Sequence, residues 1–303
     1  MKLEFTKFQG LGNDYLYFDV RSPACSAPDW SRVARVLSDR RFGVGSDGII
    51  VVGPSDCALV RMRIWNADGS EAEMCGNGLR GLVKWLYDQG VRDFGDGIET
   101  GAGILTPEIV EEDQGVARQI RISMGVPDFS RRAVGVDDSA AEFLRQPMTV
   151  AETTLVASGV SMGNPHLVIF GEAWSALDLE TWGPRLERHP WFSRRINVHL
   201  ATVADGHTLV LRHWERGVGP TLACGTGAAG AAAVGVHLGL LQSPIRVGVP
   251  GGWLSVQWEG SGTPVYLTGP SEEVFRGAVT WDETGVASAA HAAPGKESER
   301  DVV

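Results

Sequence analysis

Two stretches of this chain, WNADGSEAEMCGNG at residues 65–78 and WERGVGPTLACGTG at residues 214–227, share one layout. In each, a tryptophan stands ten positions before a cysteine, and the cysteine opens a Cys-Gly-x-Gly turn that leads into a helix-like stretch. Upstream, Asn13 and Asn164 each follow a glycine and precede an apolar run. The cysteines are 149 residues apart and the asparagines 151. Two landmarks in the same order at nearly the same offset predict a domain duplication rather than a solenoid.

The composition is that of an ordinary soluble globular protein. A length of 303 residues suits two domains, and 43% hydrophobic with 21% charged residues is ordinary for a chain that buries a full core. The net charge of −10 disfavours binding to nucleic acid or to an anionic membrane, since both need a basic face. The N-terminus has no apolar signal-peptide core, and no run approaches the ~18 apolar residues of a membrane helix. We therefore expect a cytoplasmic location.

Cysteine usage excludes two common roles. The four cysteines, at positions 25, 57, 75 and 224, include no Cys-x-x-Cys pair. This spacing indicates neither a disulfide framework nor a structural zinc site. In a reducing compartment the thiols should be free. Cys25 and Cys57 lack a Gly-x-Gly context, and we interpret both as structural or incidental.

Hydrophobic periodicity predicts short strands and one long helix per half. In the first half we expect strands at 3–8, 15–20, 49–52 and 59–65 and helices at 30–40 and from 79 to a C-terminal cap at Gly90. In the second half we expect strands at 168–170, 209–214, 245–257 and 264–268 and helices at 182–189 and 226–241.

This pattern predicts an α+β fold of two pseudo-symmetric domains that arose by internal duplication. Each domain would be a curved, mostly antiparallel sheet wrapped around a central helix, with the active site in the cleft between them. We place the first domain at residues 1–125, completed by 271–285, and the second at 126–270. Residues 286–303 lack apolar periodicity, so a disordered tail is expected there.

The position of the two motif cysteines suits proton transfer at carbon. The first N–H groups of a helix have no intrahelical partner, and the macrodipole adds positive charge there. A thiol at this place should have a lowered pKa, and the N–H groups of 76–78 and 225–227 can hold a carboxylate. If the two helices meet, an α-carbon lies between Cys75 and Cys224. One thiolate would then remove the α-proton while the opposite thiol protonates the other face.

The carbanion formed in such a reaction must be stabilised by the protein. Neither motif contains a lysine for a pyridoxal Schiff base, so we expect no pyridoxal cofactor. Stabilisation must come from preorganised N–H donors and dipoles in a dry cleft, with the two domains closing over the substrate.

Other polar residues are candidates for substrate binding. Adjacent Glu215 and Arg216 could hold the ammonium and carboxylate of an amino-acid end, although side-by-side charges are usually a solvated surface pair. His166 could orient a thiol or a carboxylate, or cap a turn. Neutral partners able to donate and accept hydrogen bonds are Asn66, Asn164 and Asn197, each of which could equally be a turn residue.

The two long motifs resemble the signature of the diaminopimelate epimerase family. The run NADGSEAEMCGNGLR at 66–80 and the stretch 214–227 carry this resemblance, and GNPH at 163–166 and FQGLGND at 8–14 fit it as well. The resemblance covers residue 1 to about residue 280 in the expected order.

Membership of this family implies an epimerase that interconverts LL- and meso-diaminopimelate without pyridoxal phosphate or metal. Its product feeds lysine and peptidoglycan synthesis in a bacterial cytoplasm, and the enzyme is often a homodimer. The resemblance implies that Cys75 and Cys224 are the two bases and that His166 lies near them. It assigns the reacting carboxylate to Gly76, Asn77, Gly225 and Thr226, and the rest of the substrate, chiefly its distal L-centre, to Asn13, Asn66, Asn164, Asn197, Glu215 and Arg216.

The chain departs from the family pattern at three positions. Gly48 stands where a Gln is frequent, Gly81 where a Cys is frequent, and Pro220 where an acidic or small residue is common. Loss of the Gln would weaken a substrate or interdomain contact. None of the three removes a residue that the proposed chemistry needs.

Three other readings of the motifs remain open at this point. A related cofactor-independent racemase would share the two thiols, but a proline-like substrate would leave Glu215 and Arg216 unpaired. A thiol redox protein would cycle a disulfide between Cys75 and Cys224. A non-catalytic amino-acid-binding protein would bind ligand without exchanging its α-proton.

Overall fold

The computed structural model describes residues 1–22, 28–171, 178–282 and 288–289. Cys25 lies outside these ranges, as does most of the predicted tail. Within that tail, Ser288–Ala289 form the short strand β20, which pairs with β19 (Glu272–Thr280).

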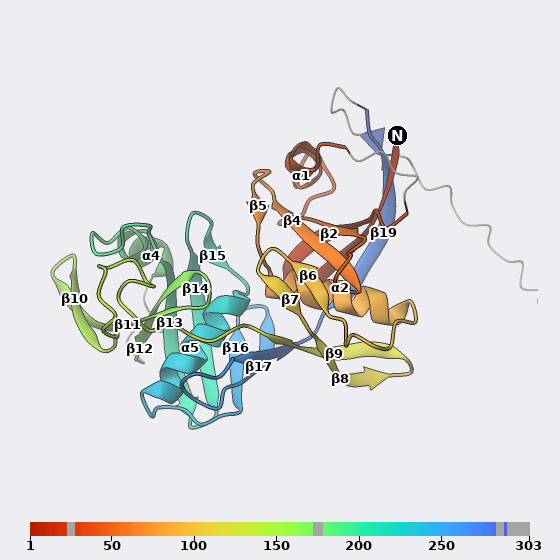
Figure 1. Ribbon diagram of the computed structural model, residues 1–303. Coiled ribbons are helices and arrows are strands. Elements are labelled where there is room, and N and C mark those ends of the chain that lie inside the picture. Colours follow the sequence, from red (N-terminus) through yellow and green to blue (C-terminus); the bar gives the residue numbers. More distant parts are fainter. Residues whose placement is uncertain (23–27, 172–177, 283–287, 290–303) are drawn as a thin grey trace, which may run out of the picture.

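The first half is built on a nine-stranded sheet (Figure 1). Strand β19 comes back from near the end of the chain and pairs antiparallel with β1. Strand β5 (Glu71–Ala72) extends the edge of β4. After β20 and β19 the order is β1 (Lys2–Gly10), β2 (Asn13–Asp19), β3 (Gly48–Gly53), β4 (Val60–Asn66), β6 (Ile98–Thr100) and β7 (Gly103–Leu105).

The second half is built on an eleven-stranded sheet. Strand β15 (Gly219–Thr221) extends the edge of β14. The order is β10 (Gln146–Val150), β11 (Thr153–Ser161), β12 (Pro165–Phe170), β13 (Asn197–Asp205), β14 (Thr208–Glu215), β16 (Ile245–Val249), β17 (Gly252–Gln257), β18 (Tyr266–Gly269), β9 (Val116–Ser123) and β8 (Glu108–Asp113).

The two sheets correspond strand by strand, which confirms the predicted duplication. The path β19-β1-β2-β3-β4-β6-β7 matches the path β10-β11-β12-β13-β14-β16-β17. Parallel pairs fall at the same places, between β2 and β3 and between β12 and β13, and again between β4 and β6 and between β14 and β16. The remaining pairs along these paths are antiparallel, so each sheet is mostly antiparallel as expected.

Each sheet holds one helix in its interior and another on its outer side. The interior helices are α2 (Gly76–Asp88) and α5 (Gly225–His237), and the outer ones are α1 (Trp30–Leu37) and α4 (Leu179–Glu187). In α2 every residue but the last is buried, as a helix enclosed by a curved sheet requires. In the part of the chain that the structure describes, none of the helices is long and apolar enough to cross a membrane.

Strand alternation explains how one sheet serves two helices. On β2, Tyr15 and Tyr17 belong to the core around α2, whereas Leu16 and Phe18 belong to the core around α1. Successive strand side chains point to opposite faces, so an unbroken apolar run is what a sheet covered on both sides needs. The core around α2 continues into the residues around α5, and the two halves therefore share one hydrophobic core.

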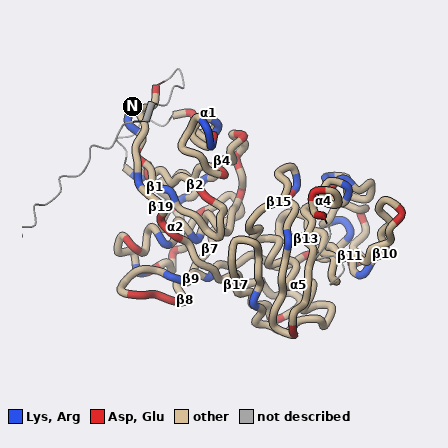
Figure 2. The backbone as a smooth tube through the Cα atoms, turned by 180° about the vertical axis from the view of Figure 1, so that it is seen from behind, with Lys and Arg blue, Asp and Glu red and all other residues tan. Residues whose placement is uncertain are grey.

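The halves also meet through strand pairing. Strand β9 pairs with β18, so residues 116–123 belong by hydrogen bonding to the second sheet, although their side chains pack on α2. The domain division at residue 125 stays a prediction. Acidic and basic residues are interspersed along the backbone of both halves (Figure 2).

Helix α2 ends where the sequence predicts. Its C-terminal cap is Gln89, and Gly90 follows with a φ of 101°, the left-handed conformation that glycine adopts without a Cβ clash. Helix α5 ends at His237, four residues before the predicted Leu241, because Gly239 at φ 71° turns the chain away.

Candidate active site

One cavity of about 700 Å³ brings together most of the predicted site residues. The first residues of both interior helices line this cavity, and so do both motif cysteines. Eleven of the predicted residues line it: Asn13, Asn66, Cys75, Gly76, Asn77, Asn164, Glu215, Arg216, Cys224, Gly225 and Thr226. A Cβ placed on Gly225 would lie 3.9 Å from Asn77 Oδ1, so the two helix starts are close neighbours.

Cys75 is the N-cap residue of α2. Its backbone is extended, and its Sγ accepts a hydrogen bond from the Gly78 N–H at 3.4 Å. The thiol in turn faces Asn13 Oδ1 at 3.7 Å and hydrogen-bonds the Tyr15 hydroxyl. The side chain is partly exposed to the cavity.

Cys224 is the N-cap residue of α5, but its surroundings differ. It makes no side-chain cap hydrogen bond, and its Sγ lies 3.7 Å from the Thr226 hydroxyl. Only 5% of the residue is exposed. The carboxyl group of Glu215 hydrogen-bonds the thiol from the facing hairpin.

Burial raises the pKa of both thiols in the unliganded protein. It raises the pKa of Cys75 above the ordinary value, and the hydrogen bond from Tyr15 and the Gly78 N–H oppose the rise. Burial raises the pKa of Cys224 well above the ordinary value, and the charge of Glu215 adds to the rise. The prediction that the helix starts leave these thiols with lowered pKa values is therefore wrong, because desolvation outweighs the first-turn N–H groups.

The second glycine of each Cys-Gly-x-Gly turn is required by close packing. A Cβ on Gly78 would lie 2.6 Å from Ile50 Cδ1, and a Cβ on Gly227 would lie 2.2 Å from His199 Cε1. Glycine thus lets each helix start press against the sheet that encloses it.

The first-half wall of the cavity is held by a polar network around Asn13. Its amide nitrogen donates to Asp47 Oδ2 at 2.6 Å, which turns Oδ1 toward Cys75. The same Oδ1 accepts from Asn77 Nδ2 at 3.2 Å. Asp47 is paired with Arg40 at 2.9 Å, in a neighbouring hollow of about 900 Å³ that also reaches Asn13.

Arg80 reaches the same network from inside the core. It is fully buried and its guanidinium donates to Asn77 Oδ1 and to the Pro270 carbonyl, the latter at 3.3 Å. Burial lowers the pKa of Arg80 to about 10. It fixes the Asn77 amide and ties α2 to the segment just before β19.

The second-half wall of the cavity is the hairpin β14–β15, which carries Glu215 and Arg216. Burial raises the pKa of Glu215, and the neighbouring Thr221 and Cys224 side chains oppose this rise. The Arg216 N–H donates to Asn197 Oδ1 at 3.0 Å, while its guanidinium donates to the Arg194 carbonyl at 2.9 Å.

Glu187, a residue that the sequence analysis did not single out, anchors the hairpin. It is 2% exposed, and its carboxylate accepts from Trp214 Nε1 at 2.8 Å and from the Gly217 N–H at 3.1 Å. These two hydrogen bonds fix the backbone on either side of Glu215 and Arg216, so Glu187 positions the segment that carries these two residues.

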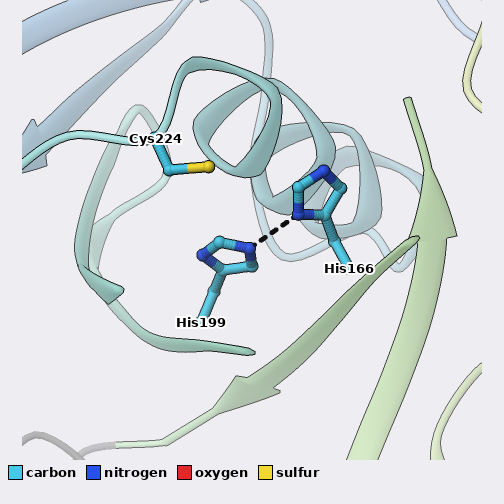
Figure 3. A group of neighbouring side chains, drawn as sticks. All are labelled: His166, His199 and Cys224. Carbon is cyan, nitrogen blue, oxygen red and sulfur yellow. Dashed lines mark hydrogen bonds between the residues drawn. The ribbon is translucent and has the colours of Figure 1, made fainter. Parts of the chain in front are cut away.

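A row of three buried imidazoles lies behind Cys224. His166 Nε2 meets Asn164 Oδ1 at 2.9 Å, and its Nδ1 meets His199 Nε2 at 2.8 Å (Figure 3). His199 Nδ1 in turn meets His213 Nδ1 at 2.8 Å. Burial lowers the pKa of His166 to about 3 and that of His213 to about 4, so the rings are neutral at pH 7.

Two predicted site residues lie outside the cavity lining. Asn197 is buried, and its amide is engaged by the Pro165 carbonyl at 2.9 Å and by the Arg216 N–H. His166 is fully buried beside Cys224, behind Asn164. For Asn197, direct contact with a substrate stays a prediction, and its observed bonds fix the loop that carries Arg216.

Comparison with known proteins identifies the family of this chain. The family model described as diaminopimelate epimerase matches residues 5–130 and 158–274. A diaminopimelate epimerase from Pelotomaculum thermopropionicum is 41% identical over 276 residues, which span 91% of this chain and 98% of that protein. One from Desulfitobacterium hafniense is 42% identical over 283 residues, covering 92% of this chain and 99% of that protein.

Solved structures of more distant proteins share the fold. A hydroxyproline epimerase from Agrobacterium vitis aligns with a TM-score of 0.68 at 12% identity, covering 95% of this chain and 96% of that chain. A phenazine biosynthesis protein from Bacillus anthracis aligns with a TM-score of 0.65 at 18% identity, covering 93% and 100% of the two chains. With two family-model segments and relatives at about 40% identity over nine-tenths of its length, the chain belongs to the diaminopimelate epimerase family.

Proposed function

We propose that this chain is an isomerase that interconverts LL- and meso-diaminopimelate by transferring protons between the α-carbon and two cysteine thiols. The observation that carries the proposal is that Cys75 and Cys224, each at the start of a duplicated helix, line one cavity. A volume of about 700 Å³ suits a small-molecule ligand.

The reacting carboxylate would bind between the two helix starts. Gly76, Asn77, Gly225 and Thr226 line the cavity, and the N–H groups of a first helical turn have no intrahelical partners. Both macrodipoles place positive charge there, so the carboxylate is attracted more strongly as negative charge builds up on it.

The proton steps then balance. The thiolate of one cysteine takes the α-proton, so the Cα–H bond breaks, an S–H bond forms, and the electron pair spreads into the carboxylate. The S–H bond of the other cysteine breaks and a new Cα–H bond forms on the opposite face. The two sulfurs end with exchanged protonation states, and each is then set to act on the opposite isomer.

The distal end of the substrate would bind where the two hollows meet. Asn13, Asn66, Glu215 and Arg216 line both hollows. Glu215 can accept from an ammonium group, and Arg216 can donate to a carboxylate after leaving the Arg194 carbonyl. A substrate with a second amino-acid end uses all of these groups, whereas a proline-like substrate leaves them unpaired.

The thiols and the family also support the cellular context. Free, uncrosslinked Cys75 and Cys224 are needed for the reaction, which suits a reducing bacterial cytoplasm. Family membership supports a homodimer and a role in lysine and peptidoglycan precursor synthesis. We retain the division into residues 1–125 with 271–285 and residues 126–270 as the two bodies that close over the substrate.

Proton NMR with the reduced protein in D₂O tests the function. LL-diaminopimelate should lose its α-proton signal while the meso isomer appears. If folded, reduced protein produces neither exchange nor meso product, the substrate assignment is wrong. Binding of diaminopimelate without any exchange would instead favour an amino-acid-binding protein.

A further inference from the structure

The thiol of Cys224 shares a buried pocket with two imidazoles. Cys224 Sγ, one nitrogen of His166 and one of His199 lie within 4.8 Å of one another, and all three residues are buried. Figure 3 shows the sulfur beside the hydrogen-bonded ring pair, at the start of α5. One thiol and two imidazoles are the donor set that suits Zn²⁺.

The hydrogen-bond pattern leaves one proton between the two ligand nitrogens. Asn164 Oδ1 can only accept, so His166 Nε2 carries the proton of that neutral ring. His166 Nδ1 is then bare and accepts from His199 Nε2–H at 2.8 Å. A cation that replaces this shared proton would be bound by both nitrogens.

The ring nitrogens that would not bind the ion, His166 Nε2 and His199 Nδ1, each have a hydrogen-bond partner, as is usual in metal sites. Histidines that bind a metal hydrogen-bond their other ring nitrogen to a second partner, which fixes the ring. Asn164 does this for His166, and His213 does it for His199 at 2.8 Å. When His199 Nε2 binds an ion, the proton of His199 moves from Nε2 to Nδ1. The proton of His213 then lies on His213 Nε2, an atom that has no hydrogen-bond partner among the described residues. Each ring keeps one proton.

A tetrahedral ion requires the three donors to move. A Zn–S bond of about 2.3 Å and Zn–N bonds of about 2.0–2.1 Å put the sulfur about 3.5 Å from each nitrogen, whereas the three donor atoms lie within 4.8 Å of one another in the metal-free protein. Two Zn–N bonds of about 2.0–2.1 Å put the nitrogens about 3.3 Å apart, so the 2.8 Å pair must open by about 0.5 Å.

We propose that Cys224, His199 and His166 form a Zn²⁺ site whose occupation blocks the enzyme. Zn²⁺ displaces the thiol proton, so an S–Zn bond forms, the S–H bond breaks, and the proton goes to solvent. Metal-bound Cys224 can neither take nor give a proton at the α-carbon. The inhibition rests on the proposed function, whereas the binding does not.

The first half of the molecule supplies an internal control. By strand register, Ile50 occupies the place of His199 and Ile64 that of His213, and Tyr15 occupies the place of His166. Cys75 thus sits at an equivalent helix start without an imidazole pair.

Titration of the metal-free, reduced protein with Co²⁺ and Zn²⁺, in the absence of substrate, tests the binding. We expect one equivalent of Co²⁺ to give a thiolate-to-cobalt charge-transfer band with tetrahedral visible bands, which Zn²⁺ then abolishes. Cys224→Ser should lose the charge-transfer band, whereas Cys75→Ser and the surface variant His207→Gln should keep it. His199→Ile, which installs the residue of the first half, should weaken Zn²⁺ binding at least tenfold, and His213→Ile by about 10–100-fold through the ring it holds.

Circular dichroism melting shows whether the histidine variants fold. If they do not, the pair Cys224→Ser and Cys75→Ser decides, because both are near-isosteric. An unchanged cobalt spectrum in Cys224→Ser, or no band in the wild type, would overturn the site. If binding is as expected but Zn²⁺ leaves epimerisation untouched, the inhibition is wrong while the site stands. If no epimerisation occurs without metal either, the proposed function has failed and the site has not.

Discussion

The two halves of the molecule place the same cysteine on the same helix start and surround it with different chemistry. Strand register pairs Tyr15 with Gly48 in the first half and His166 with Asn197 in the second. Beneath Cys75 lie a phenol and aliphatic side chains, whereas beneath Cys224 lie three imidazoles. The two halves therefore share the same backbone arrangement, but the side chains around the cysteine differ between them.

This difference has an electrostatic consequence. Cys75 has hydrogen-bond donors that favour its thiolate, and burial raises its pKa less than that of Cys224. Cys224 is more buried and faces the carboxyl group of Glu215, which disfavours a second negative charge. We therefore expect Cys75 to be the thiol that ionises first in the unliganded protein.

The largest expected effect comes from removing either thiol. Cys75→Ser or Cys224→Ser should lower kcat by about 10²–10⁴-fold, because a hydroxyl is a far weaker acid than a thiol and cannot supply the base. Initial rates from both isomers of diaminopimelate measure this. Near-wild-type epimerisation by either variant would show that one thiol suffices.

A smaller effect should follow from filling the tight glycine of the second half. Gly227→Ala brings a Cβ to 2.2 Å from His199 Cε1 and should destabilise the protein by about 1–3 kcal/mol. Urea denaturation measures the change. The double variant with His199→Ala should recover part of that loss, and strictly additive effects would mean that the His199 ring is not the obstacle.

The pH dependence of the free enzyme should follow the raised thiol pKa values. Because burial raises the pKa of Cys75, its thiolate is scarce at neutral pH, and kcat/KM should rise about tenfold per pH unit below that pKa. A profile that is flat or falling above pH 7 would contradict this. For stability the sign is opposite: the folded state holds the thiol proton more tightly, so this contribution is present below the unfolded pKa and is lost as pH rises through the folded one.

The smallest effect expected is a difference in alkylation rate. In the reduced, unliganded protein, iodoacetamide should label Cys75 several-fold faster than Cys224, since Cys75 is more exposed and ionises more readily. A Cys57→Ser background removes the exposed thiol of Cys57, and peptide mass spectrometry measures the labelling of each remaining cysteine separately. Faster labelling of Cys224 would reverse the order of ionisation inferred here.

Local patterns in the sequence predict the duplicated frame and most of the residues that line the cavity. The Cys-Gly-x-Gly turns place both helix starts correctly, and the apolar runs identify strands such as β3 and β4. Eleven site residues that were predicted, chiefly through the family resemblance, line the cavity.

The buried residues that support the cavity-lining side chains were not predicted, because their contacts depend on how distant segments of the chain pair in the fold. His199 and His213 are 14 positions apart in sequence and meet only through the register of β13 and β14. Glu187 is the last residue of a short helix, and its sequence context is that of an ordinary exposed acidic residue. In the folded protein it is buried and accepts a hydrogen bond from Trp214. The acidic strand β8 was missed since it carries almost no apolar pattern.

The three departures from the family pattern find partial explanations in the fold. A Cβ on Gly81 would lie 2.1 Å from the Tyr17 hydroxyl, which fills the space that a cysteine would need. Gly48 occupies the place that Asn197 has in the second half, and a Cβ there would lie 2.3 Å from the Trp65 carbonyl. Nothing in the structure explains Pro220, which is exposed on β15.

The central claim, that two thiols act on opposite faces, is tested most directly by following the label in the first turnovers in D₂O. The account predicts that newly formed meso-diaminopimelate carries deuterium at the α-carbon while unreacted LL substrate keeps its protium, because the protein donates from a deuterated thiol and removes the proton with another. Protium carried from the LL substrate into the meso product, or early deuterium in recovered substrate at the same rate as in product, would mean that a single base serves both faces and would contradict the account.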